Sequence, residues 1–323
     1  MANDYFAKLN KGENHPKESE SMRNGYGFLI IIILVTLLST TTSFGQDTTQ
    51  SLIQRYIESI DGDSIVINYM QPFATAFGTA INTGLYHTAK IHGLPGFDFG
   101  IRAIFIPIPD KALTFKVPPL PAGSPDTLTS TVFGPKETQA PYPPGLDKGG
   151  VPFAVFHFSV GLPMGTELNL RYLPSFDTIE DVPKIELLGF GLSHSIDQYF
   201  PVPIPLLPQL SAGFMYQKFK VEDLIESTHL AYNLRLSKSV PMLTVYLGAQ
   251  FETSDMDITF KVGELGEEKT VNLDGENDFR FTGGFRFTIF PLVGINADFS
   301  TGKYSAINIG LNFSFDPPGV PGI

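Results

Sequence analysis

The sequence predicts an all-β protein, a transmembrane antiparallel β-barrel of about twelve strands (about ten to fourteen), preceded by a short helix. Three observations lead to this prediction. The 323 residues include 28 Phe, 31 Gly and 26 Pro, a composition typical of strands joined by turns. Apolar residues alternate with small, polar or charged residues over many short segments. Short and long links between these segments alternate, as they do on the two sides of such a barrel.

The charge and the missing residue types exclude several classes of function. A net charge of −11 argues against a nucleic-acid partner, because phosphate binding requires a basic surface. The chain has no cysteine, which excludes disulfides, thiolate metal sites and thiol catalysis. It also has no phosphate-binding glycine loop and no zinc-ligand spacing, so we expect no cofactor and no metal.

The first 45 residues contain an export signal. Phe28–Leu38 is the longest apolar run, and eleven residues are too few for a membrane helix, which needs about 20. Ser43 and Gly45 stand at positions −3 and −1 of a cleavage site before Gln46. We therefore expect residues 1–21 to be a dispensable extension and residues 22–45 a cleaved signal peptide, with the outer membrane of a Gram-negative bacterium as the destination. An uncleaved anchor is the alternative.

Residues 46–71 contain a predicted amphipathic helix. Between positions 49 and 60, apolar residues recur at helical spacing, namely Leu52, Ile53, Tyr56, Ile57 and Ile60. Either this helix inserts into the barrel as a plug, with Leu52, Tyr56 and Ile60 as contact residues, or it rests at the periplasmic rim.

Residues 72–315 form the predicted barrel, and residues 316–323 form a tail. In the clearest strand, Ile307, Ile309, Leu311, Phe313 and Phe315 alternate with Asn308, Gly310, Asn312 and Ser314. A bare apolar face opposite a small or polar one indicates lipid outside and a lumen inside, with an exported β-sandwich as the alternative. We expect strands at 72–87, 96–107, 111–118, 151–162, 166–176, 185–197, 209–221, 228–238, 242–260, 270–289, 292–300 and 303–315.

The links between these strands indicate which end faces the periplasm. Those at 107–111, 163–165, 239–241 and 290–291 are tight, and short turns belong on the periplasmic side. The proline-rich segment 119–150 then forms an outer loop, because proline prevents a central strand. An acidic hairpin over 253–278 projects beyond the membrane, since its strands are about twice the ~10 residues needed to cross. Both termini are expected to face the periplasm.

Charged residues gather on the predicted inner face. A charge in a narrow lumen is far less costly when it is paired, so a network of ion pairs that braces the wall is the favoured interpretation. A polar lining for a passing solute is the alternative. The predicted lumen-lining residues are Arg102, His157, Glu167, Arg171, Arg235, Arg280, Arg286 and Asp298, accompanied by Asp98 and Glu252.

One pair of residues has a spacing that is found in catalysis. His157 and Ser159 form a His-x-Ser pair, as in outer-membrane phospholipase A and lipid A deacylase, where the pair faces the lipid. Here Phe156, Phe158 and Val160 form the apolar face, which places His157 and Ser159 in the lumen. We therefore expect no catalytic residues and no enzyme activity.

Two segments carry a resemblance to known proteins. At 165–174 (GTELNLRYLP) and 188–196 (LGFGLSHSI), followed by Phe200 and Pro-Val-Pro, the chain resembles an uncharacterised family of outer-membrane barrels. That family is distantly similar to the long-chain fatty-acid transporters. The resemblance implies an N-terminal plug and a hydrophobic ligand that enters from outside. Those transporters have fourteen strands rather than twelve, and here eight residues follow the terminal Phe315.

The sequence therefore favours an outer-membrane barrel for passive uptake of a small hydrophobic solute. A structural or surface-interaction barrel with an occluded lumen is the alternative. The expected partners are outer-membrane lipids, lipopolysaccharide and the barrel-assembly machinery, with a hydrophobic solute for the first hypothesis.

Overall fold

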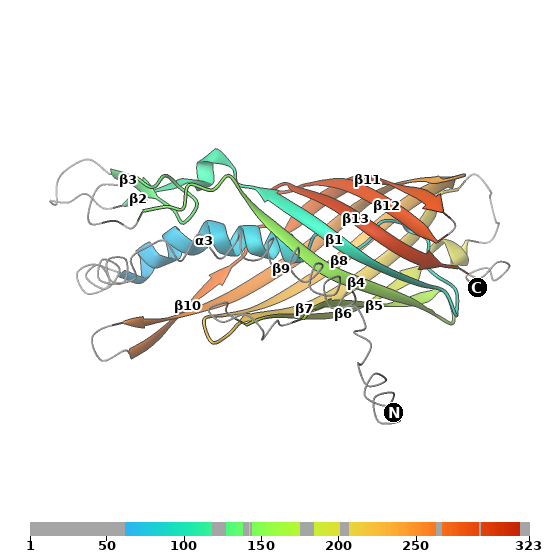
Figure 1. The fold of residues 1–323 in the computed structure, drawn as a ribbon, viewed down its shortest axis with the longest axis horizontal. Coiled ribbons are helices and arrows are strands. Elements are labelled where there is room, and N and C mark those ends of the chain that lie inside the picture. Colours follow the sequence, from blue (N-terminus) through green and yellow to red (C-terminus); the bar gives the residue numbers. More distant parts are fainter. Residues whose placement is uncertain are drawn as a thin grey trace, which may run out of the picture.

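The main feature of the fold is a closed barrel of ten antiparallel strands, which a single helix enters from one end (Figure 1). The computed structural model describes residues 62–117, 127–137, 142, 144–174, 184–200, 207–262, 267–290 and 292–316. The all-β class and the barrel are confirmed, and the number of barrel strands is ten, at the lower end of the expected ten to fourteen and below the favoured twelve. The signal peptide and the helix expected at 49–60 lie outside the described residues.

Neighbouring barrel strands follow one another along the chain, and the first pairs with the last. The seam between β1 and β13 runs from Phe97 opposite Phe315 to Phe105 opposite Ile307. The strands are β1 Phe97–Pro107, β4 Gly150–Leu162, β5 Thr166–Leu173, β6 Ile185–Ser195, β7 Gln209–Val221, β8 Ile225–Val240, β9 Leu243–Val262, β11 Phe279–Phe290, β12 Val293–Thr301 and β13 Ala306–Phe315.

The remaining elements lie outside the barrel wall or inside it. The hairpin of β2 (Thr114–Val117) and β3 (Thr127–Ser130) forms a separate sheet in the link between β1 and β4. Strand β10 (Glu267–Asp274) pairs with the C-terminal half of β9, from Asp255 to Val262. Helix α3 spans Gly62–Ile81. Two short 3-10 helices, η2 and η3, cover Asp110–Ala112 and Asp197–Tyr199.

Two of the twelve expected strands are not barrel strands. Residues 72–87 form the second half of α3 and an irregular segment, and residues 111–117 contain the end of η2 and the short β2. The expected strand 270–289 is also divided, since β10 ends at Asp274 and β11 begins at Phe279. The barrel has two strands fewer than expected, so its number of strands is still even. The links at 163–165, 239–241 and 290–291 therefore lie at the same end of the barrel, as expected. The link at 107–111 lies at the opposite end, contrary to the expectation.

Helix α3 is buried on all sides over its second half, which explains why its pattern does not look helical. Ala74, Ala76, Phe77 and Ala80 are all buried against the strands, and a helix that is apolar all round shows no amphipathic period. Phe77 packs against Phe153 of β4 and Phe219 of β7, with ring centroids 5.7 and 4.9 Å away. Burial of such a side chain contributes about 1.5–3 kcal/mol.

Residues 82–96 run through the lumen from the end of α3 to the start of β1. The Ala89 amide donates a 2.9 Å hydrogen bond to Ser237 Oγ, near the end of β8. The Gly161 amide, near the end of β4, donates to the Gly96 carbonyl oxygen at 2.8 Å. We call residues 62–96, which comprise α3 and this segment, the plug.

The two ends of the barrel differ, and the described chain begins and finishes at opposite ends. The β4–β5, β8–β9 and β11–β12 turns lie at one end together with Phe315 of β13, and we call this end the tight-turn end. The other end carries β2, β3, β10 and the start of α3 (Figure 1). Tyr69, in the first half of α3, donates a 2.9 Å hydrogen bond to the Pro144 carbonyl oxygen in the β1–β4 link. The start of the plug therefore lies at the opposite end from Phe315, whereas the two termini themselves, expected on one side, lie outside the described residues.

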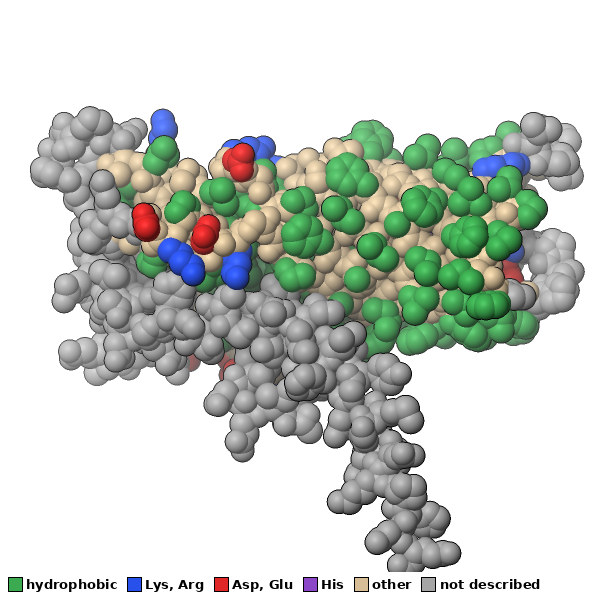
Figure 2. All heavy atoms as spheres, turned by 45° about the horizontal axis from the view of Figure 1, so that its top comes forward, with side chains coloured by type: hydrophobic (Ala, Val, Ile, Leu, Met, Phe, Trp, Pro, Cys, Tyr) green, Lys and Arg blue, Asp and Glu red, His purple; other side chains and the backbone are tan. Residues whose placement is uncertain are grey.

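An apolar band covers the barrel face seen in Figure 2, and charged side chains flank it. On β7, Phe214 and Tyr216 face outward within the band, but further along the strand Lys218 and Lys220 take the outward positions. Phe219 on the same strand is buried inside. The apolar face thus changes sides at the edge of the band, which identifies the lipid boundary. We call the part beyond this boundary, with α3, β2, β3 and β10, the cap.

Candidate functional site

The barrel wall holds the end of α3. Arg171, on the inner face of β5, donates from Nη1 to the Ile81 carbonyl oxygen at 2.5 Å and from Nη2 to the Thr83 carbonyl oxygen at 2.7 Å. Gln217 of β7 adds a 3.1 Å bond to Ile81. The last carbonyl groups of a helix lack partners within the helix and carry partial negative charge. The buried guanidinium therefore supplies both hydrogen-bond donors and a positive charge at the end of α3.

A second arginine joins the helix to an ion pair. Arg280 of β11 pairs with Glu252 of β9, and it also donates to the Thr79 carbonyl oxygen at 3.1 Å. The Glu252 carboxylate accepts further hydrogen bonds from Gln250 at 2.5 Å and Asn277 at 2.6 Å. Removing one partner from such a buried pair is strongly destabilising, because the other charge is left uncompensated.

Below the helix, a histidine of the plug lies between an arginine and an aspartate of β1. Arg102 Nη2 donates to His87 Nδ1 at 2.9 Å. Because a guanidinium only donates, Nδ1 accepts and the ring proton lies on Nε2, 3.6 Å from Asp98 Oδ2. Arg102 is also 3.5 Å from Asp98 Oδ1. All three side chains are buried.

The last contacts of the plug lie close to the tight-turn end. His92 Nδ1 is 2.6 Å from Glu167 Oε2 of β5, and the same oxygen accepts the His92 backbone amide at 3.2 Å. Lys90 pairs with Asp316, just after β13. Polar contacts therefore hold the plug from Thr79 to His92, whereas apolar packing dominates along α3.

Five of the eight predicted lumen residues contact the plug. Arg102, Glu167, Arg171 and Arg280 bond to it, and the guanidinium of Arg235 lies 5.5 Å from the centre of the Tyr86 ring. The other three bond within the wall. His157 lies 3.2 Å from Ser159, Arg286 donates to Ser314 at 2.7 Å, and Asp298 accepts from Tyr246 at 2.7 Å. The predicted plug residues Leu52, Tyr56 and Ile60 lie outside the described residues.

The sequence interpretation missed the plug residues themselves. His87 was placed in an expected strand and His92 in a short link, so no pattern paired them with Arg102 or Glu167. The inward position of Gln217 can be predicted from the alternation on β7, because Tyr216 and Lys218 on either side of it face outward. The alternation does not predict that the end of α3 lies next to it.

The His157 and Ser159 pair lacks the arrangement of an activated nucleophile. The Ser159 hydroxyl donates to Asn169 Oδ1 at 2.9 Å, so His157 Nε2 donates to Ser159 instead of accepting its proton. Both side chains are buried between the wall and the plug. This geometry fits a structural hydrogen-bond chain.

Between the lumen segment and the wall, one small polar cavity lies among the described residues. A cavity between Tyr86, His92, His157 and Arg235 leaves about 10 Å³ for the centre of a water molecule, which is about the minimum for a single water. Among the described residues, no group of His, Asp or Glu is arranged to hold a metal ion. In the same part of the chain, no helix has the length and apolar character needed to cross a bilayer.

A closed antiparallel barrel with an apolar exterior and a polar interior defines a membrane-spanning β-barrel protein, here one that contains its own N-terminal plug. The chain belongs to the family of unknown function DUF6588, whose model matches residues 22–315. A comparison with curated protein sequences found no match.

Solved structures with similar folds are outer-membrane and related barrels. OmpT, an outer membrane protein of Vibrio cholerae, is 8% identical, with a TM-score of 0.25 over 50% of this chain, which spans only 55% of its length. The translocator domain of the autotransporter NalP from Neisseria meningitidis is 11% identical (78% and 99% covered, TM-score 0.36). Ail of Yersinia pestis is 8% identical (69% and 100% covered, TM-score 0.28). The expected similarity to fatty-acid transporters has no support among these matches.

Proposed function

We propose that this chain is a surface-interaction barrel of the outer membrane with an occluded lumen, the second of the two hypotheses from the sequence. The observation that carries the proposal is the plug. It fills the apolar half of the barrel with α3 and the polar half with residues 82–96. Passive uptake through the lumen would require both halves to be cleared.

The cap supports a role on the cell surface. Its core is built from α3, the β1–β4 link and the inner faces of several strands, and it includes Phe77, Phe133, Phe153, Phe219 and Met256. A packed core of this kind resembles that of a soluble domain and gives the cap a fixed shape. Its outer surface carries exposed charged side chains, among them Lys220 and Glu226, which form an ion pair at 3.0 Å. Cap surface and membrane edge are where lipopolysaccharide and other surface partners would bind.

Orientation and delivery complete the proposal. Short turns belong at the periplasmic end, so the cap faces the outside of the cell. Export through a cleaved signal peptide and insertion by the barrel-assembly machinery would bring the chain there. We propose no catalytic activity.

Planar-bilayer recording of the purified protein tests the occluded lumen. We expect no steady single-channel openings from the intact protein and clear openings after deletion of residues 46–93. Far-UV circular dichroism and resistance to unfolding in detergent serve as controls that the deleted form is a folded barrel. Steady openings from the intact protein would contradict the proposal.

Uptake of a small hydrophobic solute is the second candidate, favoured by the polar contacts that hold residues 82–96. Hydrogen bonds and ion pairs with the wall can exchange for water, so this half of the plug is easier to displace than α3. Liposomes with the reconstituted protein would then take up fatty acids or alkanes faster than liposomes without it. Equal rates would exclude this candidate.

A further inference from the structure

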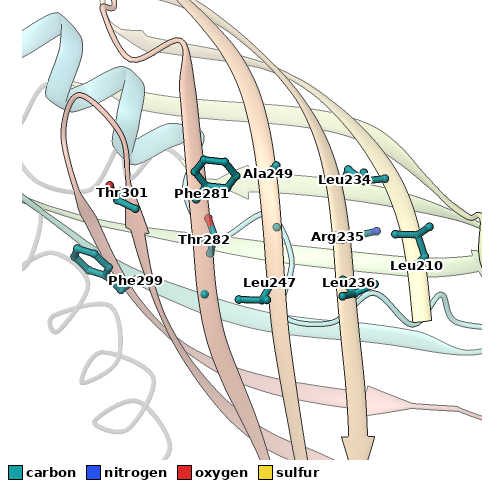
Figure 3. A pocket seen from close by; sticks show the side chains of 12 residues that line it. Leu210, Leu234, Arg235, Leu236, Leu247, Ala249, Phe281, Thr282, Phe299 and Thr301 are labelled. Atoms are coloured by element: carbon teal, nitrogen blue, oxygen red, sulfur yellow. The ribbon is translucent and has the colours of Figure 1, made fainter. Parts of the chain in front are cut away.

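An apolar groove crosses the lipid-facing side of the barrel (Figure 3). Its volume is about 590 Å³, within the usual range of about 300–1,000 Å³ for small-molecule sites. Two parallel rows of outward side chains border it, each row following directly paired residues across neighbouring strands. The first row is Leu210, Leu236, Leu247, Gly283 and Phe299. The second row is Leu234, Ala249, Phe281 and Thr301.

Small residues in the middle of these rows create the hollow. Along the outward face of β11, Gly283 stands between Phe281 and Phe285, with Phe287 and Ile289 beyond. A Cβ atom at Gly283 would meet only a Leu247 methyl at 3.4 Å, an ordinary contact. The next residue, Gly284, faces inward, where a Cβ would overlap Asp298 and Tyr246. Packing within the protein therefore requires a glycine at 284 but not at 283.

The position of the groove determines what can fill it. On β8 its residues Leu234 and Leu236 lie between the outward charges Lys238 and Glu226, and on β9 the outward face turns polar only beyond Phe251. The groove is thus within the hydrocarbon layer, where the available molecules are lipids. An unfilled hollow there would forfeit dispersion contacts along its lining.

The shape of the groove narrows the class of occupant further. Its first row crosses five strands, and four intervals of about 4.8 Å give a length of about 19 Å. The groove is only as wide as the space between the two rows of outward side chains that border it. A long, narrow and unbranched hydrocarbon fits these dimensions. We propose that the groove binds one acyl chain of a membrane phospholipid, laid across β7, β8, β9, β11 and β12.

Fluorescence quenching tests this proposal in the intact protein. The chain has no tryptophan, so Phe281→Trp places a single fluorophore at the groove. Phe105→Trp places another on the outward face of β1, eight residues from the tight-turn end of its strand, against nine for Phe281. Each barrel is reconstituted in vesicles of phospholipid with brominated acyl chains and then extracted into ordinary detergent.

We expect the Phe281→Trp barrel to keep at least a twofold quenching after extraction, because the bound lipid is retained, and the Phe105→Trp barrel to recover its full fluorescence. Adding Gly283→Leu, which fills the groove, should restore the fluorescence of the Phe281→Trp barrel. Circular dichroism confirms that each variant is folded.

Four results would overturn the proposal. Equal recovery in both single-tryptophan barrels would mean that no lipid is held in the groove. Retained quenching that survives Gly283→Leu would place the lipid elsewhere. Quenching only when bromine is carried by a free fatty acid, or shielding of the Phe281→Trp barrel from all brominated lipid, would assign the groove to a solute or to a second copy of the chain.

Discussion

The guanidinium of Arg171 donates a 2.7 Å hydrogen bond to the carbonyl oxygen of Thr83, so a residue of the wall holds the chain two positions beyond the end of α3. The same side chain bonds to Ile81 and Gly84. A single buried arginine of the wall thus binds three carbonyl groups between residues 81 and 84, where α3 ends and the lumen segment begins.

Replacing Arg171 should loosen the plug. Arg171→Met keeps the length of the side chain but leaves buried carbonyl oxygens without a donor, at a cost of about 2–4 kcal/mol. We expect a lower denaturant midpoint in detergent and brief openings in planar-bilayer recordings. Arg286→Met is the matched control, because that arginine bonds to Ser314 of the wall and not to the plug. The interpretation fails if the two variants behave alike.

The pair of Arg280 and Glu252 should show strong coupling. Either Arg280→Met or Glu252→Leu leaves a buried charge alone, and we expect each to destabilise the barrel by about 3–5 kcal/mol. The double variant should cost much less than the sum. A double-mutant cycle by urea unfolding measures this difference. The exposed pair of Lys220 and Glu226 provides the comparison, with coupling close to zero. Additive effects at positions 280 and 252 would argue against the pair as a unit.

Surface labelling should place the start of the plug outside the cell. The chain has no cysteine, so single cysteines report cleanly. Asn68→Cys lies on the exposed side of α3, and Tyr199→Cys lies in the exposed η3 at the tight-turn end. A membrane-impermeant maleimide should label only Asn68→Cys on intact cells and both variants after lysis. Labelling of Tyr199→Cys alone on intact cells would reverse the orientation.

Tyr69 should make the stability of the cap depend on alkaline pH. Burial raises the pKa of Tyr69 from 10.0 to about 12, and its hydroxyl donates to the Pro144 carbonyl oxygen. Because the folded state holds this proton more tightly, its contribution is complete below pH 10 and is lost as the pH rises towards 12. The difference in phenolate absorbance between the wild type and Tyr69→Phe should show one group titrating near 12. A transition near 10 would contradict this.

The barrel strands were predictable because lipid and lumen impose a period of two. The alternation on β13 from Ile307 to Phe315 and on β11 from Phe279 to Ile289 is visible in the sequence. The tight links expected at 163–165 and 290–291 also fall between consecutive strands of the structure. The plug was not predictable. Ala74, Ala76 and Ala80 are buried whichever way they face, so the sequence carries no periodic signal there.

The lumen residues were predictable as positions but not as contacts. Alternation placed Arg102, Glu167, Arg171 and Arg280 on the inner face, and the ion-pair interpretation is met by Arg280 with Glu252. Arg171 behaves differently, since its partners are backbone carbonyl groups. Such partners leave no trace in residue type, and they depend on where a helix ends.

The course of the plug through the lumen links its position to the closure of the barrel. Residues 62–96 precede β1, and the barrel closes where β13, the last described strand, pairs with β1 from Phe97 opposite Phe315 to Phe105 opposite Ile307. The plug is therefore joined directly to one side of the seam that closes the barrel. When β1 and β13 are paired, the wall encloses the plug, and the plug is covalently continuous with β1, the first strand of the wall.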